Sequence, residues 1–191
     1  MTVIFHEVCH GAAAFALGDD TAKRMGRLTL NPLKHIDLFW TVLLPAVLFV
    51  SSHGHFAIGM AKPVPVDFSR LCRPKRDMIW VALAGPAANI LLAVLLSLWF
   101  KFSGLSILLY AIYFNLGIAM FNLVPIPPLD GSRILAGLLP NRLAYRLLMI
   151  EPYGFIIILA LYFTGVLFRF IVPGMDLFCR ILDIPRLSTA I

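Results

Sequence analysis

Long runs of apolar residues, separated by short polar and basic segments, dominate the chain. The apolar runs occupy residues 38–50, 78–100, 105–124 and 153–172. A helix needs about 20 consecutive apolar residues to cross the hydrocarbon core of a bilayer, and the longer runs meet this requirement. The pattern therefore predicts an all-α polytopic membrane protein with about four transmembrane helices.

Breaks in the pattern indicate what lies between these helices. The run at 38–50 contains Pro45 and leads into a polar stretch at 51–55, so we expect 38–60 to form a re-entrant hairpin. The stretch AKPVPV at 61–66 is too rich in proline for a helix and suits a short extended edge strand. The whole chain, 1–191, is read as one membrane-embedded domain. Its other expected elements are a helix at 1–17 that stops at Gly18, transmembrane helices at 77–101, 105–124 and 153–172, a short helix at 131–139, and an interfacial tail at 174–191.

Composition and charge support this class. The 191 residues are 60% hydrophobic and 14% charged, whereas soluble domains carry about 25% charged residues. The net charge is +6, but the basic residues lie between the apolar runs, as in cytoplasmic loops of membrane proteins. We therefore expect a lipid bilayer as partner and no nucleic acid. The three cysteines (Cys9, Cys72, Cys179) are too few and too scattered for a disulfide framework.

Two histidines and a glutamate stand in the first apolar segment as His6-Glu7-Val8-Cys9-His10, an HExxH motif. On a helix, residues i and i+4 share a face, so His6 and His10 can present two imidazoles to one metal ion. Glu7 lies beside them and can act as general base on a water bound to that metal. The alternative is three ordinary polar residues on a solvated helix face. Ionisable groups inside a membrane helix are costly, which favours the metal site.

A catalytic zinc site usually needs a third protein ligand. Asp130 follows the helix-breaking sequence PIPP, and irregular backbone at membrane depth is tolerated where it lines a cavity or is buried in protein. The alternative is that PPLDG is only a turn, since Pro, Asp and Gly are common turn residues. From the residues alone both readings stay open. The candidates are Asp130, Glu151, His35, His53 and His55.

Three motifs together resemble the site-2 protease family of intramembrane zinc metalloproteases, and in particular its small bacterial members without PDZ or CBS domains. They are HEVCH at 6–10, GPAAN at 85–89 and NLVPIPPLDG at 122–131. The likeness extends through GD at 18–19, NPLKHID at 31–37 and AKPVPV at 61–66, and so covers nearly the whole chain. One departure is that only five residues precede His6, fewer than members of this family usually have.

The resemblance implies roles for particular residues. One Zn²⁺ per chain would be bound by His6, His10 and Asp130, with Glu7 as the catalytic general base. Asn122 and Asn89 would contact the substrate backbone or stabilise the oxyanion. For either asparagine, the alternative is a hydrogen bond between helices.

The basic residues also predict an orientation. If 38–60 enters and leaves by one face, nine of the 16 lysines and arginines lie on a single side of the membrane, with Lys101 opposite. The positive-inside rule makes the crowded side cytoplasmic, with the site nearer that face of a bacterial cell membrane. That side would carry Lys23, Arg24, Arg27, Lys34, Lys62, Arg70, Arg73, Lys75 and Arg76.

These observations predict a zinc metalloendopeptidase that hydrolyses peptide bonds within or near transmembrane segments. Its substrates would be membrane-tethered proteins or signal-peptide-like segments. Two other classes stay open: an inactive zinc-binding membrane scaffold or chaperone, and a metal transporter. A transporter would be expected to show paired repeats and several acidic residues at the bilayer midplane, and neither is visible in the sequence.

Overall fold

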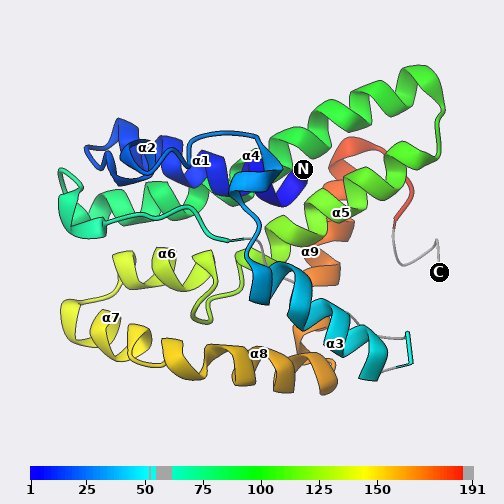
Figure 1. The fold of residues 1–191 in the computed structure, drawn as a ribbon. Helices are drawn as coiled ribbons and strands as arrows, with labels where there is room; N and C mark the ends of the chain where they lie inside the picture. The colour runs from blue at the N-terminus through cyan, green and yellow to red at the C-terminus, as the bar shows by residue number, and fades with distance from the viewer. Residues whose placement is uncertain (52, 55–61, 187–191) are drawn as a thin grey trace.

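The computed structural model describes residues 1–51, 53–54 and 62–186, and these residues form helices and no β-strand (Figure 1). The α-helices are α1 Thr2–Ala16, α2 Thr21–Arg24, α3 Leu44–Ser51, α4 Pro74–Ser103, α5 Ile107–Asn122, α6 Asp130–Leu138, α7 Asn141–Leu148, α8 Gly154–Phe163 and α9 Val166–Leu182. Shorter turns are the 3₁₀ segments η1 Pro32–Lys34, η3 Phe68–Arg70 and η4 Glu151–Tyr153, and the π-helical segment η2 Leu38–Leu43.

A helical hairpin of α4 and α5 forms the base on which the other helices pack. Gly104 ends α4 in a left-handed conformation (φ 67°), and its N–H donates to the carbonyl of Phe100 at 2.8 Å. A glycine at this position ends a helix without a steric penalty, so the chain can turn back along α5. Helix α9 packs on α5, and α1 and α6 pack on α4. The buried core of the hairpin and α9 consists of Ala93, Ile112, Leu116, Met175, Cys179 and Ile184.

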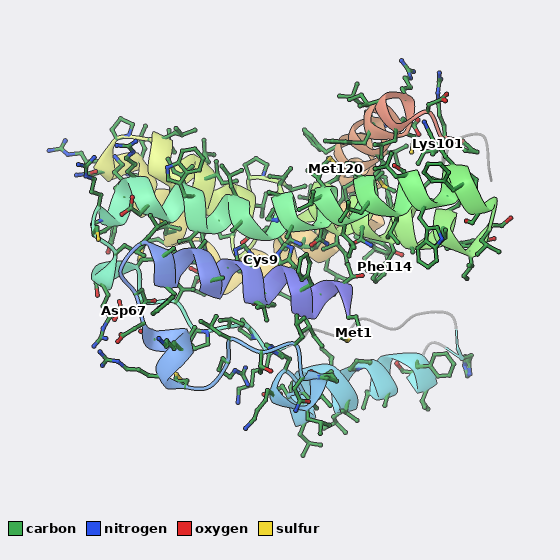
Figure 2. All side chains as sticks on the ribbon, turned by 90° about the horizontal axis from the view of Figure 1, so that it is seen from above. Met1, Cys9, Asp67, Lys101, Phe114 and Met120 are labelled. Atoms are coloured by element: carbon green, nitrogen blue, oxygen red, sulfur yellow. The ribbon has the colours of Figure 1, made fainter. Side chains whose placement is uncertain are left out.

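The C-terminal end of α1 lies beside the N-terminal end of α4. The N–H of Cys72 donates to the carbonyl of Leu17 at 3.0 Å, and Ala14, Leu71 and Val81 form a buried apolar cluster at this end. Figure 2 shows Asp67 near this end of α1 and Lys101 at the far end of α4. The two helices therefore carry their Gly18 and Asp77 ends on the same side of the molecule.

The predicted edge strand at 61–66 is wrong for the residues that the structure describes. Residues 62–67 are neither helical nor paired with a strand. Pro63 and Pro65 have no N–H to donate to a ladder. The backbone N–H groups of this segment are instead taken up by other partners: Lys62 donates to the carbonyl of His35 and Val64 donates to the side chain of Glu7.

The predicted helix at 153–172 is also wrong, because α8 ends at Phe163 and a new helix begins at Val166. Gly165 lies between them with φ 73°, a left-handed conformation that breaks the helix. Helix α9 then continues through Pro173 to Leu182 and takes in the first half of the predicted interfacial tail. Thr164 and Gly165 are two small residues between apolar stretches, and so short a gap did not reveal the break.

Within the part of the chain that the structure describes, two helical stretches are long and apolar enough to cross a membrane. They are Pro74–Ser103, which is α4, and Asn141–Phe163, which joins α7, η4 and α8. Helix α5 is apolar but has 16 residues. The expected number of about four transmembrane helices therefore stays a prediction.

The segment between His35 and Lys62 begins and ends at one place. The N–H of Lys62 donates to the carbonyl of His35 at 2.9 Å. The chain that continues from His35 into η2 and α3 is therefore back beside His35 at Lys62. Its last part, residues 55–61, lies outside the described residues. This closure agrees with the predicted hairpin, whereas its re-entry into a membrane stays a prediction.

Candidate metal centre

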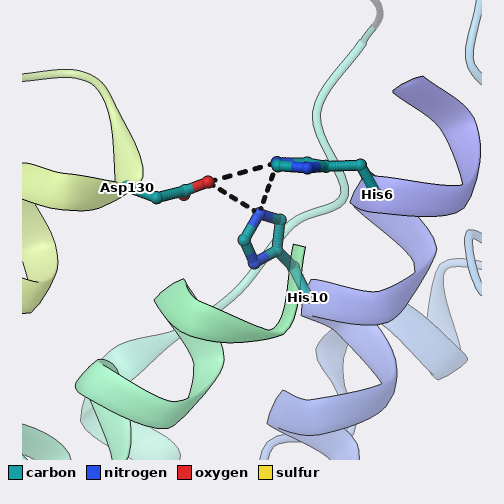
Figure 3. A group of neighbouring side chains, drawn as sticks. All are labelled: His6, His10 and Asp130. Carbon is teal, nitrogen blue, oxygen red and sulfur yellow. Dashed lines mark hydrogen bonds and ion pairs between the residues drawn. The ribbon is translucent and has the colours of Figure 1, made fainter. Parts of the chain in front are cut away.

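His6, His10 and Asp130 meet at one point of the structure (Figure 3). Both histidines lie on the face of α1 that packs on α4, and both are buried. The Nε2 atoms of His6 and His10 are 2.9 Å apart, and each lies 3.1 Å from Oδ2 of Asp130. Among the described residues, these form the one group of three or more side chains placed to share a metal ion.

Asp130 reaches this point because the start of α6 is in close contact with the backbone that follows α5. A Cβ atom on Gly131 would lie 2.5 Å from the carbonyl oxygen of Val124, so no other residue fits there without a shift. Ser132 closes the first turn of α6 by donating from its hydroxyl to the carbonyl of Leu129 at 2.7 Å. The close approach of two backbones therefore requires a glycine at position 131.

Gly85 of α4 forms the floor under the two imidazoles. A Cβ atom at this position would lie 2.6 Å from Nε2 of His6 and 2.6 Å from Cε1 of His10. The sequence analysis used Gly85 only as part of the GPAAN motif at 85–89. Its presence in a motif was the available signal, but only the packing of α1 on α4 reveals that an absent side chain makes room for the site.

The outer nitrogens of the imidazoles face oxygen acceptors. Nδ1 of His10 lies 2.7 Å from the carbonyl oxygen of Val81, and Nδ1 of His6 lies 3.2 Å from Oδ1 of Asn89. A carbonyl can only accept, so Nδ1 of His10 carries a proton, and the same tautomer suits His6. Both Nε2 atoms then present lone pairs. Partners of this kind orient metal-ligating histidines in known metal sites.

This donor set fits a divalent cation. Two imidazole lone pairs and a carboxylate oxygen face one another at 2.9 to 3.1 Å, an arrangement that is repulsive without a positive charge among them. Zinc takes imidazole and carboxylate ligands at about 2.0–2.2 Å, so His6, His10 and Asp130 would together hold such an ion. Three protein ligands leave a fourth position for water or substrate, as in catalytic zinc sites.

Glu7 lies next to these ligands on α1 but is not part of their triangle. Its Oε2 accepts a hydrogen bond of 2.9 Å from the backbone N–H of Val64. The half-buried carboxylate therefore lies between α1 and residues 62–67.

The remaining predicted site residues lie outside the triangle of His6, His10 and Asp130. Asn122 donates from Nδ2 to the carbonyl of Ile118 within α5 at 2.9 Å. Asn89 is fully buried and contacts His6, which makes it a partner of a candidate metal ligand. Of the other ligand candidates, Glu151 pairs with Arg133, and Nε2 of His35 donates to the carbonyl of Thr29. His53 lies in the turn after α3, and His55 lies outside the described residues.

Comparison with known proteins places the chain among zinc metalloproteases. It is 37% identical over 173 residues to the Bacillus subtilis protein named "Putative zinc metalloprotease YwhC", covering 83% of this chain and 75% of the relative. It is 32% identical over 179 residues to "Putative zinc metalloprotease Rip2" of Mycolicibacterium smegmatis, covering 88% of this chain and 66% of the relative. A "Zinc metalloprotease MJ0392" of Methanocaldococcus jannaschii is 29% identical over 127 residues, covering 56% of this chain and 37% of the relative.

The chain belongs to the site-2 protease family. The likeness to YwhC covers most of both proteins, and the names of the relatives support a zinc metalloprotease. No family model matches the chain, and no solved structure matches it. The names of these site-2 protease relatives imply zinc, and His6, His10 and Asp130 form a candidate binding site for that ion.

Proposed function

We propose that this protein hydrolyses peptide bonds within or beside the transmembrane segments of membrane-tethered substrates. The observation that carries the proposal is the meeting of His6, His10 and Asp130 in one buried triangle. These side chains come from two helices that pack on the long apolar helix α4. Leftover signal peptides and membrane-tethered proteins are the substrate class that such a site would take.

The depth of the triangle supports cleavage inside the membrane. Gly85 lies under both imidazoles and is eight residues beyond Asp77 in α4. At 1.5 Å per residue this is about 12 Å along the helix. If α4 crosses the hydrocarbon core, which is about 30 Å thick, with Asp77 near its boundary, the metal centre lies well below the lipid surface.

The chemistry assigned to the chain's residues follows from their positions. A zinc ion bound at this site supplies a Lewis acid and lowers the pKa of a coordinated water to about 7. His6, His10 and Asp130 hold the ion and leave one side open. Glu7 accepts the proton of the attacking water and delivers it to the leaving amine. Asn122 is a candidate donor to the oxyanion, a role in which its Nδ2 would leave the carbonyl of Ile118.

Residues 62–67 are a candidate docking edge for the unwound substrate. The segment is not helical and lies against Glu7 through Val64. An extended peptide can pair with such an edge through its main chain. Prolines 63 and 65 have no N–H, and the N–H groups of Lys62 and Val64 already bond to His35 and Glu7. A substrate that pairs with this segment through those N–H groups would therefore have to replace these bonds.

We place the site nearer the cytoplasmic face of a multi-pass membrane protein. The ends of α1 and α4 that lie together, joined by the hydrogen bond between Cys72 and Leu17, adjoin the segments rich in lysine and arginine. Lys101 lies at the opposite end of α4 (Figure 2). The positive-inside rule then assigns the crowded end to the cytoplasm.

The decisive experiment compares Glu7→Gln with wild type for zinc content and for cleavage of a model transmembrane substrate. The proposal expects the variant to keep its zinc, because Glu7 is outside the triangle, and to lose cleavage by a factor of about 10² or more. A wild type that holds zinc without cutting would favour the scaffold. Zinc flux through reconstituted vesicles, unchanged in Glu7→Gln, would favour the transporter.

A further inference from the structure

Residues 62–67, which we call the strap, lie directly across α1 at the candidate active site. Val64 is buried, and a Cβ atom on Gly11 of α1 would lie 2.6 Å from its Cγ1 atom. One residue therefore ties the strap to α1 twice, through this packing and through the hydrogen bond from its N–H to Glu7. The position of the Glu7 carboxylate depends on where the strap lies.

Two buried charged side chains fix the ends of the strap. At its start, one guanidinium nitrogen of Arg27 donates to the carbonyl of Lys34, and Nη2 lies 3.4 and 3.3 Å from the carbonyl oxygens of Lys62 and Pro63. At its end, Oδ2 of Asp19 accepts from the N–H of Asp67 at 2.7 Å. Arg27 thus joins the chain at Lys34 to the chain at Lys62 and Pro63, on either side of residues 36–61.

Arg27 differs from the basic residues that only mark the side of a membrane. It is 9% exposed, and it forms no ion pair with the part of the chain that the structure describes. All of its side-chain hydrogen bonds there go to backbone carbonyls. Burying a permanently charged group is unfavourable unless its donors are satisfied. A planar guanidinium can bind carbonyls from two segments at once, whereas the single nitrogen of lysine cannot reproduce this fork.

We infer that Arg27 is a positioning residue for Glu7. By holding the carbonyls of Lys62 and Pro63, it keeps the N–H of Val64 in reach of the Glu7 carboxylate. The inference rests on the proposed role of Glu7 as general base. Without Arg27 these carbonyls lose a charged donor and the strap moves away from α1. The zinc ligands stay in place because α1, which carries His6 and His10, and α6, which carries Asp130, both keep their packing on α4.

Activity measurements on Arg27→Gln, with Arg24→Gln as matched control, test this inference. Arg24 lies three residues away with a side chain that is 64% exposed and paired with Asp20. Arg27→Gln is expected to keep one zinc per chain and a KM within about threefold of wild type, while kcat falls by roughly 10²-fold, as when a catalytic group is displaced by about 1 Å. Arg24→Gln is expected to match wild type in all three quantities.

Hydrogen exchange of the same proteins supplies a readout that does not depend on cleavage. In Arg27→Gln the amides of peptide 62–67 are expected to exchange roughly tenfold faster, because the strap loses hydrogen bonds to a charged donor, while α4 amides stay unchanged. A wild-type kcat, a loss of zinc that parallels the loss of activity, or unchanged exchange in the strap would each overturn the inference. If wild type itself does not cleave, the proposed function fails, and the exchange result alone decides whether Arg27 positions the strap.

Discussion

Gly85 of α4 lies directly beneath the imidazole of His10, so close that a Cβ atom at residue 85 would be 2.6 Å from Cε1 of that ring. The same Cβ would lie 2.6 Å from Nε2 of His6. Two candidate metal ligands therefore depend on the absence of one methyl group.

Gly85→Ala is expected to weaken zinc binding by at least about tenfold, because both imidazoles must move away from Asp130. Zinc affinity would be measured by competition with a chelator on detergent-purified protein. Gly117→Ala is the matched control, since a Cβ there would meet the side chain of Met175 at an ordinary 3.9 Å. Equal zinc affinity in the two variants would contradict the close packing of α1 on Gly85.

Asn89→Leu is expected to lower zinc affinity by about 10- to 100-fold, the usual effect of removing a hydrogen-bond partner of a metal-ligating histidine. Its Oδ1 is the partner of His6 Nδ1. Asn115→Leu in α5 is a suitable control, because Asn115 is equally buried and donates to the carbonyl of Ala111. A zinc affinity that falls in both variants would show a general loss of helix packing instead.

Asp19 is expected to make stability depend on pH. Burial by itself raises the pKa of this carboxyl, but hydrogen bonds from Thr21 and from the N–H of Asp67, with Arg70 nearby, outweigh burial and hold the pKa below its ordinary value of 3.8. A carboxyl with a lowered pKa in the folded state stabilises the fold above its unfolded pKa, and this contribution disappears as pH falls through the folded pKa.

Thermal unfolding of Asp19→Asn and wild type, both freed of metal, checks this expectation. The variant should unfold at a lower temperature at pH 6, and the difference should shrink as the pH falls below about 4. Asp20→Asn removes an exposed carboxylate and is expected to have a much smaller effect. A difference between wild type and Asp19→Asn that stays constant down to pH 2 would contradict the role of its charge.

Cysteine labelling from the two sides of a membrane tests the orientation. Cys72 is exposed, and its N–H bonds to Leu17 at the end of α1. In a chain without the other two cysteines, Cys72 and Asp20→Cys should react from one side, and Ser103→Cys from the opposite side. Labelling of residues 20 and 72 from opposite sides would reject the predicted hairpin and the orientation with it.

The sequence by itself identified the candidate site residues and the helices that carry most of them. The spacing of His6 and His10 predicts a shared helix face, and α1 has that face. The apolar runs placed α4 and α5 to within a few residues. These predictions succeed because helical periodicity and the length of an apolar run are local properties of the chain.

The residues alone left the third ligand open, and here the resemblance chose Asp130. The structure adds the contact of Gly131 with the end of α5, which brings a carboxylate 120 residues distant in sequence to within 3.1 Å of His10. No local pattern encodes such a contact, because it depends on how α6 packs.

Tertiary structure alone decided three further features of the site. They are the glycine floor under His6 and His10, the partners of the two Nδ1 atoms, and the clamp by which Arg27 holds the strap. They involve backbone carbonyls, the side chain of Asn89 and a glycine, and no local pattern shows which side chain each of these groups will meet. Local patterns specify which groups a chain carries, whereas the packing of helices on one another determines which of those groups meet.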